Sequence, residues 1–235
     1  FAPYAPTALA LCQQRIAETL QQIEAAERGD TDAWPDRDTL ECSLDVLSSV
    51  AESLGEQLLP LLQQQQQLLL LLERCCSDKS PSVLQSALAL VGDLAKHCAV
   101  VPRPEVIFPL LQQHLLHGSI SVVNNAGWAL GELSLRVSPE VLSPFAVPLS
   151  SLLICIIHKQ DMHKALLQNV AITLGRLAGV CPSALSPLLP DFLSRWCVLS
   201  RTTKNDADKA GAFRGYAADA AVAARGIGCM LRVYY

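Results

Sequence analysis

The feature that most constrains the fold of this chain is an internal repeat of about forty residues. Three copies share a template of small and aliphatic residues that ends in Gly-x-Leu: Gln85–Leu94, Asn124–Leu133 and Gln168–Leu177. Gly92 and Gly131 are 39 residues apart, and Gly131 and Gly175 are 44 residues apart. In weaker copies, Ser49 precedes Gly92 by 43 residues and Gly215 follows Gly175 by 40. Units of this length bury their apolar faces against one another, so the period predicts a stack of similar units.

Each copy follows a second apolar segment, and turn-forming residues separate the two, which makes the repeating unit a helical hairpin. The predicted first helices lie near 5–26, 56–76, 104–116, 139–157 and 183–198. The predicted second helices lie near 39–54, 81–98, 119–137, 162–180 and 207–222. The predicted fold class is all-α, a HEAT-repeat superhelical solenoid over residues 1–222, with hairpins near 5–54, 56–98, 104–137, 139–180 and 183–222. We expect residues 223–235 to be a divergent and poorly ordered tail.

Helical phase divides each second helix into a core face and an opposite face. At about 100° per residue, positions −5, −2, −1 and +2 from the template glycine fall in one narrow arc. These positions are the predicted core: Ala87, Leu90, Val91, Leu94, Ala126, Ala129, Leu130, Leu133, Val170, Thr173, Leu174 and Leu177. Trp128 points roughly opposite this arc, together with Asn124, Gly131 and Glu132. A tryptophan directed away from its own core indicates a contact surface, and packing on a neighbouring repeat is the alternative.

The same face carries polar residues in several copies of the repeat. Its members are Asp45, Glu52, Asp93, Asn124, Glu132, Asn169 and Ile172. Side-chain amides can bond the main chain of an extended peptide, and carboxylates attract its lysines and arginines. For any single charge, a solvated helix face is the simpler interpretation. The combination around Trp128 favours a peptide-binding groove lined by the second helices.

Composition excludes several classes of function. Apolar residues make up 51% of the 235 residues, which argues against disorder, and the formal net charge of −4 argues against direct nucleic-acid binding. Nine cysteines without a CxxC pair are typical of reduced thiols inside a cell. The longest apolar stretch, Leu58–Leu72, is interrupted by glutamines and too short for a bilayer, so we expect no membrane contact. The chain starts at Phe1 without an initiator Met, and we expect it to be part of a longer protein.

One hairpin loop holds much of the negative charge. The segment Glu27–Glu41 contains six acidic residues against Arg28 and Arg37, so its net charge is 2 − 6 = −4. Exposed charges are screened within about 10 Å at 0.1 M ionic strength. We therefore expect basic peptides to bind this chain more weakly as salt rises.

Several segments match one protein family: Pro3–Thr7 (PYAPT), Val50–Gly55, Gly92–Lys96 (GDLAK), Asn124–Glu132 (NNAGWALGE), Ala171–Pro182 (AITLGRLAGVCP), Arg195–Cys197 (RWC) and Ala212–Gly215 (AFRG). On these segments the chain resembles the transportins, nuclear import receptors of the importin-β superfamily. The resemblance runs from about residue 3 to residue 216 and is to the C-terminal half of these receptors. It is lost from Ala217 to Tyr235, and Leu84 stands where family members tend to carry arginine.

The resemblance implies that Trp128 packs on the basic or hydrophobic part of a cargo's proline-tyrosine nuclear localisation signal. The implied cargo-binding residues are Asp45, Glu52, Asp93, Ile120, Asn124, Trp128, Glu132, Asn169 and Ile172. The full-length protein would also bind nucleoporins and Ran, with the Ran site outside this chain. It would shuttle between cytoplasm and nucleus through nuclear pores.

The residues do not predict an enzyme, a metal site or a cofactor. Two Cys–His pairs lack a third group that would orient the base: His97–Cys98 and Cys155–His158. Two histidine groups fall short of four ligands: His114 with His117, and His158 with Asp161 and His163. The alternative function is a structural HEAT scaffold that holds partner proteins. A scaffold would expose apolar residues at its loops, whereas a cargo receptor would expose them on its second helices.

Overall fold

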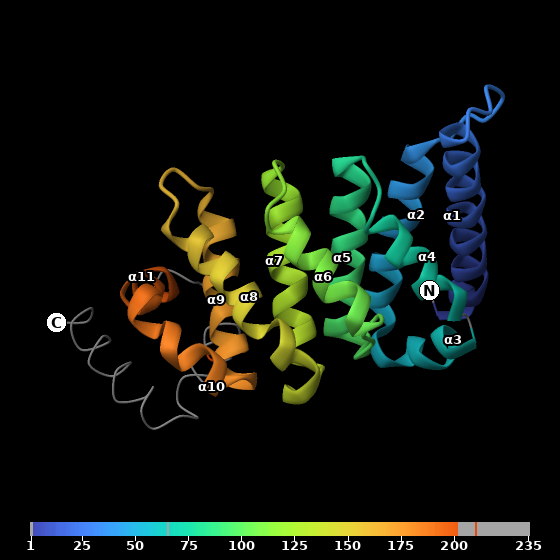
Figure 1. Cartoon of the computed structure of the whole chain (residues 1–235). Helices are drawn as coiled ribbons and strands as arrows, with labels where there is room; N and C mark the ends of the chain where they lie inside the picture. The colour runs from blue at the N-terminus through green and yellow to red at the C-terminus, as the bar shows by residue number, and fades with distance from the viewer. Residues whose placement is uncertain (1, 65, 202–209, 211–235) are drawn as a thin grey trace. The chain divides into compact units, whose positions relative to one another are not determined.

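The computed structural model describes residues 2–64, 66–201 and 210 of the chain. Every regular element in these residues is an α-helix or a short 3-10 helix, and none is a strand (Figure 1). The contacts divide the chain into two compact units, Phe1–Leu110 and Leu111–Tyr235, called unit 1 and unit 2 below. The predicted all-α fold is confirmed.

The helices of unit 1 follow the predicted hairpins closely. They are η1 (Ala2–Tyr4), α1 (Ala5–Glu27), α2 (Arg37–Leu54), η2 (Gly55–Leu58), α3 (Leu59–Gln64), α4 (Gln66–Cys75), α5 (Pro81–Cys98) and the first part of α6 (Pro104–His114). The helix predicted over 56–76 begins with the 3-10 turn η2 and continues as α3 and α4. Gly55 ends α2 with a φ of +55°, a left-handed conformation that favours glycine.

Ion pairs connect the successive hairpins of unit 1. The pairs are Arg37–Asp78, Arg74–Glu24, Lys79–Glu27 and Arg103–Glu73. The side chains of Asp78 and Glu73 are only 4% exposed, and the backbone N–H of Arg103 also donates to Glu73 at 3.1 Å. A buried carboxylate is costly without a charged partner, and Arg37 and Arg103 supply that partner to Asp78 and Glu73.

The remaining helices form unit 2. They are the end of α6, α7 (Ile120–Ser134), α8 (Pro139–His158), α9 (Lys164–Val180), α10 (Pro182–Leu185), η3 (Ser186–Leu188) and α11 (Leu189–Arg201). Pro139 and Pro182 begin α8 and α10, where a missing N–H costs little. The helix predicted over 207–222 and the predicted tail over 223–235 lie outside the described residues, apart from residue 210.

The predicted core of the second helices is confirmed. Each of the twelve predicted side chains on α5, α7 and α9 is at most 2% exposed. Within unit 1, α5 packs on α2, and within unit 2, α9 packs on α7. Burying one leucine or valine side chain stabilises a fold by about 1.5–3 kcal/mol, so these helix pairs account for much of each unit's stability.

One helix among the described residues, α8, is long and apolar enough to cross a membrane by length and composition alone. We expected no membrane contact because the longest apolar stretch, Leu58–Leu72, is too short, and α8 was not predicted as a candidate. In unit 2, α8 packs on α9, α10 and α11. Its Leu142, Leu149 and Leu153 are fully buried there. The core helix of a soluble protein and a signal sequence pass the same test.

The helices α7 and α9 approach each other closely at Gly131. A Cβ on Gly131 would lie 2.5 Å from Thr173 Oγ1 and 3.2 Å from Arg176 Nη1. The same proximity lets the Thr173 hydroxyl donate to the backbone oxygen of Gly127 at 2.8 Å. Gly127, one turn earlier, has more room, because its nearest neighbours would be 3.9 Å and 4.0 Å from a Cβ. Helix packing therefore favours glycine at position 131.

Two substitutions in α7 test this conclusion. We expect Gly131→Ala to lower the free energy of unfolding by about 1–3 kcal/mol, because the new methyl group would overlap Thr173. We expect Gly127→Ala to raise it by about 0.5–1 kcal/mol, because alanine is the better helix former. Urea unfolding followed by circular dichroism measures both, and equal effects would contradict the packing argument.

Candidate functional site

An amide pair joins α7 and α9 within the predicted contact surface. Asn169 Nδ2 donates to Asn124 Oδ1 at 3.0 Å, and Asn124 Nδ2 lies 3.4 Å from Asn125 Oδ1. Asn124 and Asn169 are both half-buried. The structure thus brings two of the predicted site residues together. Their direct hydrogen bond was not predicted.

A hollow of about 280 Å³ lies beside the amide pair, where α7 and α9 begin. It is lined by Ile120, Ser121, Asn124, His163, Ala165 and Leu166. Ile120 is 50% exposed at the first position of α7. Ile172 is half-buried and follows Asn169 by three residues, on the same side of α9. The two predicted isoleucines therefore lie on the same two helices as the amides.

Trp128 continues this line along α7. It follows Asn124 by one helical turn and Ile120 by two, so the three lie on one side of the helix. Trp128 is half-buried. It differs from Trp196, which is 2% exposed and donates its indole N–H to the backbone oxygen of Ala171 at 2.7 Å. Trp128 thus keeps an accessible part while the remainder packs on the protein.

The predicted exposure of Glu132 is wrong. Glu132 is buried, and its Oε1 accepts a hydrogen bond from Arg176 Nη1 at 2.8 Å. Gly131 is buried as well. The helical wheel placed both residues opposite the core of α7, but α9 packs against that flank and covers it.

The partner of Glu132 could have been found in the sequence. Glu132 and Arg176 follow the template glycines Gly131 and Gly175 directly, so they occupy equivalent positions 44 residues apart. Opposite charges at one template position in consecutive repeats are brought together when the second helices stack. The pair was not predicted, because the helical phase of a single repeat does not show which charges of the next repeat lie opposite.

The predicted acidic residues of unit 1 lie on α2 and α5, which pack together. Asp45 and Glu52 are exposed on α2, and Asp93 is half-buried on α5. Burial raises the pKa of Asp93 above its usual range, and the charge of Glu52 raises it further while His97 opposes the shift. The three carboxylates therefore differ: two are solvated, and the third is partly desolvated beside Glu52.

The structure shows the surroundings of one residue from each Cys–His pair. Burial raises the pKa of Cys98 to about 11, so this side chain is a neutral thiol at physiological pH. His158 Nε2 lies 2.7 Å from the backbone oxygen of Asp191, a partner outside the predicted Cys155–His158 pair. In the part of the chain that the structure describes, no group of His, Cys, Asp or Glu is arranged to hold a metal ion.

Comparison with curated proteins identifies the relatives of this chain. It is 36% identical over 219 residues to transportin-1 of Homo sapiens and 35% identical over 223 residues to importin subunit beta-2 of Schizosaccharomyces pombe. Each comparison covers 92% of this chain. The chain is a homologue of transportin and importin subunit beta-2. It spans only 24% of the length of either relative, and no family model matches it. The predicted resemblance to transportins is confirmed.

Comparison with solved structures supports the fold class. A designed armadillo repeat protein matches with a TM-score of 0.64 at 18% identity, covering 90% of this chain and 87% of that protein. A second one, solved in complex with the peptide (KR)4, matches with a TM-score of 0.63 at 17% identity, covering 92% and 88%. Identities this low show the fold alone. The predicted class, a solenoid of helical repeats, is confirmed.

The buried pair Glu132–Arg176 yields a prediction about stability. Both side chains are 7% exposed, so removing Arg176 leaves the Glu132 carboxylate buried without its charged partner. We expect Arg176→Ala to lower the free energy of unfolding by about 3–5 kcal/mol. We expect the double variant Glu132→Ala/Arg176→Ala to lose less than the sum of the single variants in a double-mutant cycle.

The pair Arg15–Glu18 provides a matched control. Its side chains are 57% and 42% exposed. We expect Arg15→Ala to lower the free energy of unfolding by less than about 1 kcal/mol, when all of these variants are compared by urea unfolding. If Arg176→Ala costs as little as Arg15→Ala, the buried pair does not stabilise the α7–α9 contact.

Proposed function

We propose that this chain is a cargo-binding part of a nuclear import receptor. In this proposal it binds proline-tyrosine nuclear localisation signals on the concave surface expected from its second helices. The observation that carries the proposal is the Asn124–Asn169 amide pair, flanked by Ile120 and Trp128, on a homologue of transportin. Homology alone supports a nuclear import receptor, and the site supports recognition of a peptide.

The amides would hold the main chain of an extended peptide. One hydrogen bond joins Asn169 to Asn124, and each side-chain amide has two N–H groups and an oxygen with two lone pairs. The pair therefore retains both donors and acceptors for peptide N–H and C=O groups. Because each amide orients the other, less side-chain entropy is lost when the peptide binds.

The apolar side chains would supply the anchor. Trp128 offers the accessible part of an indole, which can cover an aliphatic side chain or the face of an arginine. Ile120 and the adjacent hollow of about 280 Å³ can accept one further apolar side chain. Asp45, Glu52 and Asp93 would attract the basic residues of the signal. Glu132 has no place in this proposal because Arg176 neutralises it in the interior.

The proposal includes further partners of the full-length protein. As part of a transport receptor, the chain would enter the nucleus with its cargo and return. The full-length protein would bind nucleoporins and Ran, with Ran held outside this segment. No cofactor, membrane or nucleic acid has a role in this proposal.

A structural scaffold is the second candidate, and the exposed apolar side chains of the loops favour it. Trp34 is 86% exposed and Leu116 is 71% exposed, and both lie between helices. Ile120, on a second helix, is 50% exposed. A scaffold would bind its partners through Leu116 and similar loop residues and would be indifferent to Trp128.

Substitution of Trp128 separates the two candidates. We expect Trp128→Ala to weaken binding of a basic proline-tyrosine signal peptide by about 2 kcal/mol, roughly thirtyfold, because a central aromatic anchor is lost. Leu135→Ala, at the exposed end of the same helix, is the matched control and should bind normally. Fluorescence anisotropy of a labelled peptide measures both affinities.

Thermal unfolding of Trp128→Ala, compared with Trp196→Ala, completes this test. Trp196→Ala is the reference for a buried tryptophan, and we expect it to lower the free energy of unfolding by about 3–5 kcal/mol. We expect Trp128→Ala to lose clearly less. If Trp128→Ala is as unstable as Trp196→Ala but binds the peptide normally once folded, Trp128 is a packing residue and the site is wrong.

The exposed carboxylates of unit 1 yield a prediction about salt. We expect the affinity for a basic signal peptide to fall between about 50 mM and 200 mM salt, because exposed charges are screened over about 10 Å. Asp45→Asn/Glu52→Gln should reduce this dependence. Glu140→Gln, which removes an exposed carboxylate at the start of α8, should not. A flat affinity across this range would exclude charge attraction from the mechanism.

A further inference from the structure

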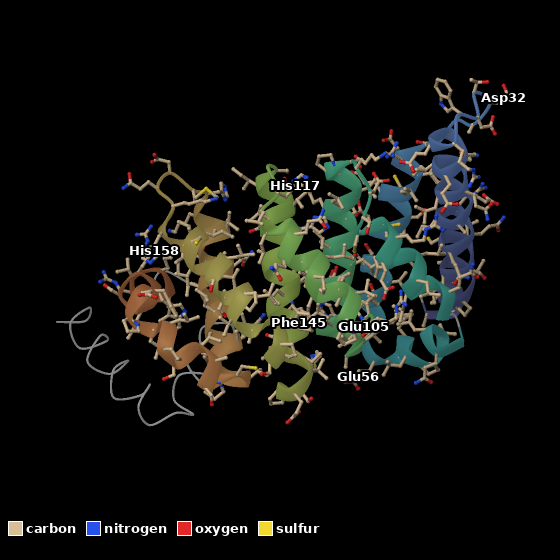
Figure 2. All side chains as sticks on the ribbon, in the orientation of Figure 1. Asp32, Glu56, Glu105, His117, Phe145 and His158 are labelled. Carbon is tan, nitrogen blue, oxygen red and sulfur yellow. The ribbon has the colours of Figure 1, made fainter. Side chains whose placement is uncertain are left out.

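A second surface, in unit 1, has no part in the proposed cargo site. The loop 28–36 joins α1 to α2 and ends with Trp34, Pro35 and Asp36. Trp34 is 86% exposed, more than any other large apolar side chain among the described residues. The loop extends beyond the ends of both helices, with Asp32 at its tip (Figure 2). The indole N–H of Trp34 makes no hydrogen bond within the described ranges.

A hollow of about 570 Å³ lies beside Trp34, between α1 and α2. Its lining includes Glu18 and Gln22 of α1, Trp34 of the loop, and Asp38 and Cys42 of α2. This volume is large enough for more than one side chain. An exposed indole at the edge of a hollow is an arrangement that can hold an extended segment of another protein.

The charges at this surface indicate what the segment would be. Asp36 caps the N-terminus of α2: its carboxylate accepts hydrogen bonds from the Asp38 N–H and from the Thr39 hydroxyl. It is therefore less available to a partner. The carboxylates of Asp32 and Asp38 are exposed and have no hydrogen bond or ion pair in the described part of the chain. Arg37 is neutralised by Asp78 at 2.9 Å, and Arg15, which also lines the hollow, pairs with Glu18 at 3.2 Å. Arg28 is exposed at the start of the loop, but the exposed Asp30, Asp32 and Asp38 outnumber it, so the charge left available to a partner is negative.

We propose that Trp34 and this hollow bind a lysine- and arginine-rich segment of a partner protein. A guanidinium or ammonium group can lie over the indole face, where a cation–π contact forms. Asp32 and Asp38 would then accept charge-assisted hydrogen bonds from the neighbouring basic side chains. This interaction goes beyond the proposed cargo site, because its residues lie on α1, α2 and their loop and include no member of the amide pair.

The test uses the whole chain and an octa-arginine peptide as the probe. In a Trp128→Phe background the tryptophans are Trp34 and the buried Trp196, so a change in emission on titration reports on Trp34. We expect Trp34→Ala to weaken binding of the fluorescein-labelled peptide about tenfold and Trp34→Phe about threefold. Asp32→Asn/Asp38→Asn should weaken it by a similar factor at low salt only.

Three outcomes would overturn the proposal. They are unchanged emission of Trp34 on titration, equal affinity of Trp34→Ala and the parent chain, and equally tight binding of an octa-glutamine peptide. Circular dichroism verifies that each variant is folded, which we expect because Trp34 is almost fully solvated. Failure here leaves the Trp128 test unaffected, since that test measures a proline-tyrosine peptide and a residue of unit 2.

Discussion

The contact between successive second helices depends on a residue without a side chain. In unit 2, Gly131 allows α9 to approach α7 until a Cβ there would lie 2.5 Å from Thr173 Oγ1. Three polar contacts then form across the interface, between residues 44 to 46 positions apart: Asn169 to Asn124, Thr173 to Gly127 and Arg176 to Glu132. These separations are close to the repeat length, because each hydrogen bond joins neighbouring positions of consecutive repeats.

The same interface links stability to the proposed function. Asn124 and Asn169 hold α7 and α9 together and also offer the amide groups that a peptide would use. Trp128 is likewise half-buried, with part of its indole accessible. A peptide laid along this line would contact side chains whose positions are already fixed by packing, which lowers the entropic cost of binding.

The two units use charge in different ways. In unit 1 the ion pairs between hairpins involve partly exposed arginines and lysine, and Asp32, Asp38, Asp45 and Glu52 remain solvated. In unit 2 the pair Glu132–Arg176 lies in the interior. The negative charge available to basic partners is therefore concentrated on the described surface of unit 1, while the amide pair and Trp128 belong to unit 2.

For the described residues, the helices and the core arcs of α5, α7 and α9 were predictable from the sequence, because a helix period of about 3.6 residues and a repeat of about forty residues are local patterns. The exposure of residues on the flanks of the second helices was not predictable from the sequence. Whether Glu132 faces water depends on how closely α9 packs on α7, and that distance is set by Gly131 and Thr173 on two different helices. The exposure of Trp34 likewise depends on where its loop lies beyond the ends of α1 and α2. A single-helix pattern shows which face is apolar, but only the tertiary structure decides which of the other faces a neighbour covers.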